Sequence, residues 1–139
     1  MYKDLIFDET HIVLQKGKIT KKSPTLVRVQ QGNFFHDLLN INEFGARWSV
    51  SDAMKQISEA GKGIILLIDG ENNKVTEFNE INASRKKRVS VPNNDPRRIG
   101  IGSQILRDLG VKKIKLMGSE VRYPSLSGFD LEVIEYLKK

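Results

Sequence analysis

An unbroken apolar run from Gly63 to Ile68 constrains the fold of this chain more than any other feature. The run reads Gly-Ile-Ile-Leu-Leu-Ile and is followed at once by the polar turn residues Asp69 and Gly70. A continuous apolar stretch without polar alternation is typical of a strand that is covered on both faces. The chain is therefore expected to build an α/β domain around a central strand at 63–68.

Two helices are expected, one before that strand and one after it. The first is capped by Ser49 or Ser51 and stopped by Gly61, because serine accepts hydrogen bonds from free helix amides and glycine tolerates the left-handed helix end. The second runs from about Pro96 to Leu109 and is ended by Gly110. Their apolar faces are formed by Val50, Ala53, Met54 and Ile57 in the first helix and by Ile101, Ile105, Leu106 and Leu109 in the second.

Alternating or β-branched segments predict further strands at 11–16, 25–30, 113–117 and 131–136. The first two flank a short polar connection, which suggests that they pair with each other. Residues 1–10 are a candidate tail, and residues 69–94 are expected to be a working loop or a mobile segment, because they are long, polar and without periodicity. The sequence thus predicts one α/β domain over residues 1–139, with a mixed β-sheet flanked by helices.

The composition is that of a soluble globular protein, with 39% hydrophobic and 29% charged residues. No apolar run approaches the roughly 20 residues that span a bilayer, and no signal-peptide pattern is present, so a cytoplasmic protein without a membrane partner is expected. A formal net charge of +6 favours anionic partners, such as a phosphorylated small molecule. The basic run from Arg85 to Arg88 raises a nucleic-acid-binding module as a distant third hypothesis, but the motifs that would support it are missing.

Several segments carry a family resemblance in one register, from about Val13 to Lys139. The segment from Leu126 to Glu135, Leu-Ser-Gly-Phe-Asp-Leu-Glu-Val-Ile-Glu, is similar to the closing Gly-(Phe/Tyr)-x-Leu-Glu-Val-Val-Glu of GTP cyclohydrolase II. The capped helix that follows Asp95 is similar to the family's preceding helix. The chain therefore resembles the GTP cyclohydrolase II family, and the resemblance implies the GTP cyclohydrolase II fold.

The resemblance also implies a catalytic zinc that is held by three cysteines. In register, the ligand positions fall on Asn33, Phe44 and Ala46, and the chain contains no cysteine. Phenylalanine and alanine cannot ligate a metal, and His11 and His36 have no paired spacing with suitable donors. We therefore expect no zinc, no other cofactor and no opening of the GTP ring, because zinc supplies the nucleophile for that reaction.

Asp95 and Arg97 match the family's Asp-x-Arg, a pair to which the resemblance assigns a catalytic role. Asp95 followed by Pro96 also fits an ordinary N-cap and first helical residue. Because the metal ligands are missing, we interpret the pair as vestigial. A second hypothesis keeps Arg28, Arg97 and Arg122 as a nucleotide or phosphate sensor without catalysis.

The residues from Leu126 to Tyr136 are especially similar to the end of zinc-less domains that are fused to 3,4-dihydroxy-2-butanone 4-phosphate synthase. This resemblance implies a degenerate module of riboflavin biosynthesis. Its partner is expected to be a second copy, in a homo-oligomer, or the synthase domain. The apolar residues that replace the metal loop are expected either to fill the core or to face a partner: Phe34, Phe35, Leu38, Leu39, Phe44 and Trp48.

Overall fold

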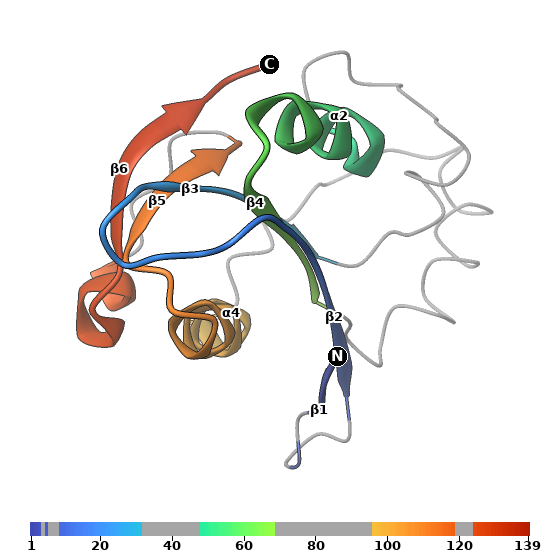
Figure 1. Ribbon diagram of the computed structural model, residues 1–139. Coiled ribbons are helices and arrows are strands. Elements are labelled where there is room, and N and C mark those ends of the chain that lie inside the picture. The colour runs from blue at the N-terminus through green and yellow to red at the C-terminus, as the bar shows by residue number, and fades with distance from the viewer. Residues whose placement is uncertain (4, 6–8, 32–47, 69–95, 119–123) are drawn as a thin grey trace, which may run out of the picture.

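The computed structural model places one sheet between two helices (Figure 1). It describes residues 1–3, 5, 9–31, 48–68, 96–118 and 124–139. One helix covers each face of the sheet, and the carboxyl-terminal strand lies at the side of the sheet far from the amino terminus. The predicted loop at 69–94 and the apolar segment at 34–39 lie outside the described residues.

Six strands form the sheet in the order β1-β2-β4-β3-β5-β6. Their bounds are Tyr2–Lys3 (β1), Thr10–Lys16 (β2), Thr25–Gln31 (β3), Gly63–Ile68 (β4), Lys113–Met117 (β5) and Glu132–Leu137 (β6). β3 is parallel to β4 and β5, and β5 is parallel to β6, whereas β2 is antiparallel to β4. The predicted mixed sheet is confirmed. The suggested pairing of β2 with β3 is wrong, because the wholly apolar β4 lies between them and is covered on both sides.

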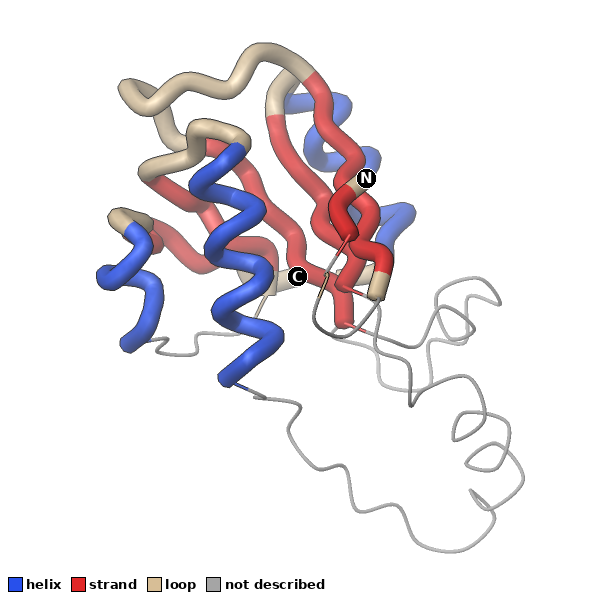
Figure 2. Tube along the Cα trace, turned by 90° about the horizontal axis from the view of Figure 1, so that it is seen from below, coloured by secondary structure: helices blue, strands red, loops and turns tan. Residues whose placement is uncertain are grey.

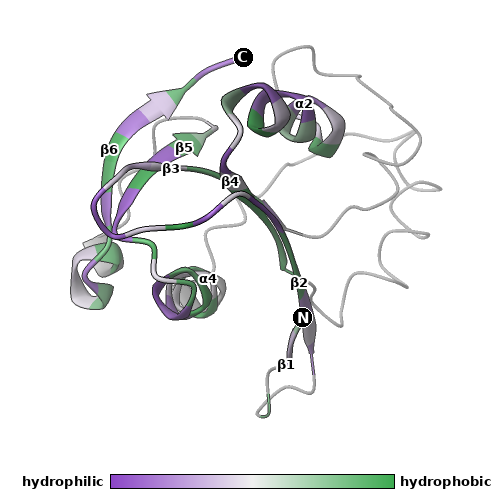
Figure 3. Ribbon diagram, viewed as in Figure 1, coloured by the Kyte–Doolittle hydropathy of each residue, from purple (hydrophilic) through white to green (hydrophobic). Residues whose placement is uncertain are grey.

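β4 is the centre of the molecule, and all of its residues are buried. Ile64, Leu66 and Ile68 belong to one core, on the face that α4 covers. Ile65 and Leu67 belong to a second core, on the face that α2 covers. Colouring by hydropathy shows this strand as a continuous apolar band (Figure 3). The apolar run therefore has the covered position that its pattern predicts.

The first predicted helix is α2 (Val50–Ala60). Of the two candidate caps, Ser49 is the one used, because its Oγ accepts a hydrogen bond from the amide of Asp52 at 3.0 Å. Gly61 ends the helix with φ 74, in the left-handed region that favours glycine. The expected apolar face needs one correction, since Met54 is 53% exposed and lies outside the surface that packs on β4.

The second predicted helix is α4 (Pro96–Asp108), and Gly110 follows it with φ 79. Gly102 lets the helix approach β4 closely, because a Cβ at this position would lie 3.2 Å from Cδ1 of Ile68. The short 3-10 helix η1 (Pro124–Phe129) lies beside α4 on the same face of the sheet (Figure 2). None of the described helices is both long and apolar enough to cross a bilayer.

The first residues of the chain belong to the fold. Tyr2 and Lys3 form β1 and pair with His11 and Thr10 of β2. The hydroxyl of Tyr2 donates a hydrogen bond to Asp108 Oδ2 at 2.6 Å. The interpretation of residues 1–10 as a tail is therefore corrected for Tyr2, Lys3 and Thr10. Cross-strand pairing holds all three, and Tyr2 also contacts α4.

Candidate functional site

The carboxyl ends of four strands meet at one edge of the sheet. β3, β4, β5 and β6 run in the same direction. α2 leads into the start of β4, and α4 leads into the start of β5, so the amino ends of both helices lie at this same edge. Open α/β sheets bind ligands outside the carboxyl ends of their strands, and helix amino ends carry partial positive charge. This carboxyl edge is the candidate site.

Arg28 of β3 joins three segments at the carboxyl edge. Its Nη1 donates to the carbonyl of Met117 at 3.0 Å. Its Nη2 donates to the carbonyl of Trp48 at 2.9 Å and to Oε1 of Gln30 at 2.6 Å. The guanidinium thus fixes the end of β5 and the residue before the α2 cap to β3.

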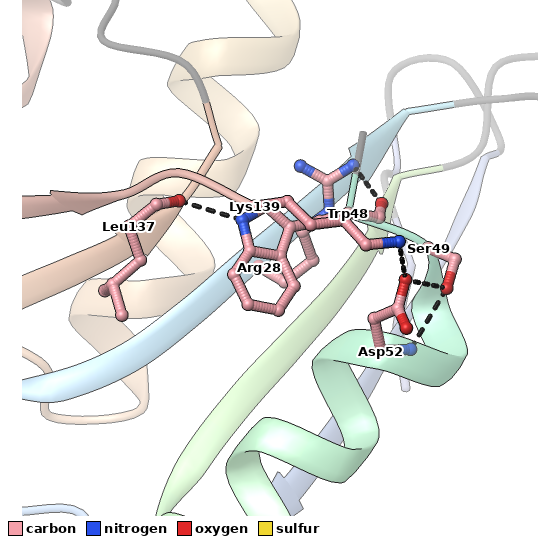
Figure 4. A network of polar contacts seen from close by, with 6 residues as sticks. All are labelled: Arg28, Trp48, Ser49, Asp52, Leu137 and Lys139. Carbon is pink, nitrogen blue, oxygen red and sulfur yellow. Dashed lines mark hydrogen bonds and ion pairs between the residues drawn. The ribbon is translucent and has the colours of Figure 1, made fainter. Parts of the chain in front are cut away.

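Trp48 connects the same place to the last strand (Figure 4). Its indole Nε1 donates to the carbonyl of Leu137 at 2.8 Å, and that carbonyl also accepts from the amide of Gly118 at 3.0 Å. The Trp48 ring packs against the core on the α2 face. Of the two roles proposed for the apolar residues near the former metal loop, core filling is the one that the structure shows for Trp48.

A carboxylate lies at the amino end of α2. Asp52 Oδ2 accepts from Ser49 Oγ at 2.8 Å and from Lys139 Nζ at 2.5 Å. These contacts keep the pKa of Asp52 below its ordinary value of 3.8, chiefly through the hydrogen bond from Lys139 and then through that from Ser49. Burial opposes the change. The network in Figure 4 therefore anchors the start of α2 to both β3 and the end of β6.

The predicted site residues are described to different extents. Arg28 is described in full, and its ligand-binding role stays a prediction beside the structural contacts above. Arg97 lies in the first turn of α4, at the carboxyl edge, and its side chain is outside the described part. The other predicted positions lie outside the described residues, so their roles also stay predictions: Asn33, Phe44, Ala46, Asp95 and Arg122.

The zinc donors that the resemblance implies are not available in this chain. The sequence has no cysteine, and the described ranges contain no group of three or more His, Cys, Asp or Glu side chains that could hold a metal ion. His11 is buried in β2, with 1% of its surface exposed, and its ring nitrogens have no hydrogen-bond partner among the described residues. The donor set does not fit a tetrahedral thiolate site.

Sequence reasoning missed most of the network at α2. The spacing of Ser49 and Asp52 is a capping signal that local inspection can detect. The contacts of Lys139 with Asp52 and of Trp48 with Leu137 join residues that are 87 and 89 positions apart. No periodicity in the sequence indicates contacts at that separation.

Comparison with known proteins places this chain in a family. Its six-stranded mixed sheet, with one helix on each face, defines the class of an α/β domain. The family model described as GTP cyclohydrolase II matches residues 1–138. The chain belongs to the GTP cyclohydrolase II family.

Its relatives are longer proteins. A 3,4-dihydroxy-2-butanone 4-phosphate synthase of Pseudomonas aeruginosa is 41% identical over 98% of this chain and 38% of its own length. A riboflavin biosynthesis protein RibBA of Bacillus cereus is 31% identical over 96% of this chain and 36% of its own length. The crystal structure of RibBX, a two-domain 3,4-dihydroxy-2-butanone 4-phosphate synthase from A. baumannii, has a TM-score of 0.52 and 31% identity, over 92% of this chain and 31% of that one. The chain thus spans less than two fifths of these relatives.

Proposed function

We propose that this chain is a cyclohydrolase II-like module of riboflavin biosynthesis that does not open the GTP ring itself. The observation that carries the proposal is the complete absence of cysteine. The family resemblance implies three thiolates that hold the catalytic zinc, and carboxylate and imidazole side chains at other positions do not reproduce that donor set. The remaining Asp95 and Arg97 have no metal-activated nucleophile to assist.

The proposed role is structural or regulatory, beside 3,4-dihydroxy-2-butanone 4-phosphate synthase. One observation supports this partner, and a second supports a structural role. The relatives named as that synthase match nearly the whole of this chain with little more than a third of their own length. Within this chain, the groups at the carboxyl edge bind one another: Arg28 bonds to two main-chain carbonyls, and Asp52 bonds to Lys139. A second copy of the chain is the other proposed partner, and the cytoplasmic location stays a prediction.

An assay of GTP turnover tests the loss of catalysis. The purified chain is incubated with GTP and an excess of zinc, and formate and the pyrimidine product are measured, with a cysteine-bearing family member as the positive control. We expect no product above the protein-free reaction. Formate release together with stoichiometric bound zinc would contradict the proposal.

A mixing experiment tests the partner. The synthase of P. aeruginosa without the segment that matches this chain is mixed with the chain, and both sedimentation and synthase turnover are measured. We expect a heavier species or a change in turnover when the chain is added. Independent sedimentation with unchanged turnover would remove the synthase as partner and leave the GTP result untouched.

A further inference from the structure

A group of lysines lies at the edge of the sheet opposite to the candidate site. β3, β4, β5 and β6 begin at this amino edge, and β2, which is antiparallel to β4, ends there. The described connections of this edge gather at the top of Figure 2. The connection from β2 to β3, residues 17–24, carries three exposed lysines, here called the loop lysines: Lys18, Lys21 and Lys22.

Packing and hydrogen bonds fix the connection that carries the loop lysines. Ile19 packs against the core on the α4 face. Lys62 Nζ donates a hydrogen bond to Ser23 Oγ at 2.7 Å. Gly17 has φ 73, and a Cβ at this position would lie 2.6 Å from the carbonyl oxygen of Gly61. The loop lysines therefore extend from backbone that both the core and the end of α2 hold in place.

Neighbouring lysines of the amino edge have structural contacts, whereas the loop lysines have none in the described part. Lys16 Nζ donates to the carbonyl of Ser58 at 3.3 Å and to its Oγ at 2.9 Å, where the last carbonyls of α2 carry partial negative charge. Lys112 is paired with Asp130 at 3.4 Å. The loop lysines have neither a hydrogen bond nor an ion pair with a residue that the structure describes.

Acidic side chains near this edge do not neutralise the loop lysines. Those in the described part are Glu59, Asp108, Asp130 and Glu132. Asp108 accepts from the hydroxyl of Tyr2 at 2.6 Å, and Glu132 lies opposite Lys113 where β5 and β6 begin. Glu59 lies in the last turn of α2 and forms no ion pair with the loop lysines. Three positive charges on one short connection attract an anion that several of them can share.

The chemistry of this surface determines which kind of anion fits it. Protein interfaces are depleted in lysine and use aromatic anchors, and helices that bind membranes insert apolar side chains. None of the exposed large apolar side chains of the described part belongs to residues 17–24: Met1, Leu5, Ile12, Leu14, Met54 and Ile134. A lysine ammonium is a compact, hydrated point charge that binds phosphate without a fixed geometry. The surface therefore fits successive phosphate groups better than a protein or a membrane.

We propose that the loop lysines bind a chain of phosphate groups, either the backbone of a nucleic acid or an inorganic polyphosphate, without reading bases. Each ammonium group neutralises one phosphate and releases its condensed counterions, so binding is strongest at low salt. Contacts of this kind position the chain and carry no sequence information. The proposal does not depend on the proposed function, because it uses the opposite edge of the sheet. It also makes no use of the basic run at 85–88, which lies outside the described residues.

Fluorescence anisotropy of a labelled oligouridine, titrated with the whole chain at several salt concentrations, tests the proposal. We expect the logarithm of the association constant to fall against the logarithm of the salt concentration with a slope of about −2, since each of the three contacts contributes about −0.7 on a single strand. An oligoadenosine of equal length should bind equally well. Inorganic polyphosphate is titrated separately at equal phosphate concentration, and the ligand that binds more tightly identifies the source of the chain.

Two variants of equal net charge show where the phosphate chain binds. Lys21→Gln with Lys22→Gln removes two loop lysines, whereas Lys55→Gln with Lys138→Gln removes two exposed lysines of α2 and of the residues after β6. We expect K21Q/K22Q to raise the dissociation constant about tenfold or more at low salt and to reduce the slope by about 1.4. K55Q/K138Q should keep the wild-type slope. Circular dichroism verifies folding, and K18Q is compared with K55Q if the double variant does not fold.

Three results would overturn the proposal. The first is a wild-type chain that binds neither oligonucleotide nor polyphosphate at low salt. The second is an equal loss of affinity in K21Q/K22Q and K55Q/K138Q, which would show that net charge alone attracts the anion. The third is a clear preference between uridine and adenosine, which would show that bases are read. The measured quantity is affinity for a phosphate chain, so failure here is distinguishable from failure of the GTP assay.

Discussion

At the scale of single residues, Asp52 shows how one side chain serves several contacts. It accepts from Ser49 and from Lys139, and it lies in the first turn of α2. The side chains of Lys139 and Asp52 are 33% and 38% exposed, so their ion pair is worth roughly 0.2–1 kcal/mol. A carboxylate in the first turn of a helix also interacts favourably with the helix dipole. The hydrogen bond from Lys139, and then that from Ser49, lower the pKa of Asp52.

The first prediction concerns how the free energy of unfolding changes at acid pH. A carboxyl group whose pKa is lowered by folding stabilises the protein at pH values above its ordinary pKa of 3.8. That contribution is lost as the pH falls through the pKa of the folded state. Asp52→Asn should therefore destabilise the chain by about 1 kcal/mol at pH 7 and by less at acid pH. Urea unfolding as a function of pH measures the difference. Glu59→Gln, in the same helix, is the control, and parallel curves for D52N and wild type would contradict the argument.

At the scale of elements, the ends of α2 are set by individual residues while its position is set by packing. Ser49 and Gly61 provide the local start and stop. Ala53 and Ile57 are buried on β4, and Trp48 holds the segment before the cap to β6. The helix is thus anchored at its amino end, which is the end that faces the carboxyl edge.

The second prediction separates the two serines that begin this helix. Ser49→Ala removes the acceptor for the amide of Asp52 and should cost about 1 kcal/mol. Ser51 is exposed in the first turn, so Ser51→Ala should change stability by less than about 0.5 kcal/mol. Thermal or urea unfolding measures both. An equal loss in the two variants would show that Ser49 is not the effective cap.

At the scale of the whole molecule, distant segments close the fold. Tyr2 of the first strand donates to Asp108 at the end of α4, 106 positions away. Burial of the tyrosine, its hydrogen bond to Asp108 and the charge of that carboxylate raise the pKa of Tyr2 from its ordinary value of 10.0 to about 12. This contact attaches β1, at one edge of the sheet, to the carboxyl end of α4.

The third prediction concerns how the free energy of unfolding changes at alkaline pH. The unfolded tyrosine loses its proton near 10.0 and the folded one near 12, so the stability from this contact is present below pH 10 and is lost as the pH rises to 12. Tyr2→Phe should lower the free energy of unfolding by about 1 kcal/mol at neutral pH. Above pH 10 the free energy of unfolding of this variant should fall less steeply with pH than that of the wild type. Denaturant unfolding between pH 8 and 12 measures it. Asp108→Asn keeps a hydrogen-bond acceptor without charge, so its free energy of unfolding should fall with pH at an intermediate slope. Identical slopes for Y2F and the wild type would refute the assignment of this pH dependence to Tyr2.

The sequence by itself determined the local elements. The apolar run at 63–68, the serine and glycine at the ends of α2 and the Pro96 start of α4 are read from neighbouring residues, because helix caps and side-chain periodicity act over a few positions. The absence of cysteine is also a property of the sequence, since no fold supplies a cysteine that the chain lacks.

The tertiary structure decided the order of the strands and the partners at the candidate site. β4 lies between β2 and β3 because this position buries both of its apolar faces and pairs both of its edges. The free energy gained in this way outweighs the tendency of β2 and β3, which a short connection joins, to pair with each other. The contacts of Arg28 with Met117 and of Asp52 with Lys139 join segments nearly ninety positions apart. Such contacts form when packing brings the segments together, and no local pattern in the chain specifies them.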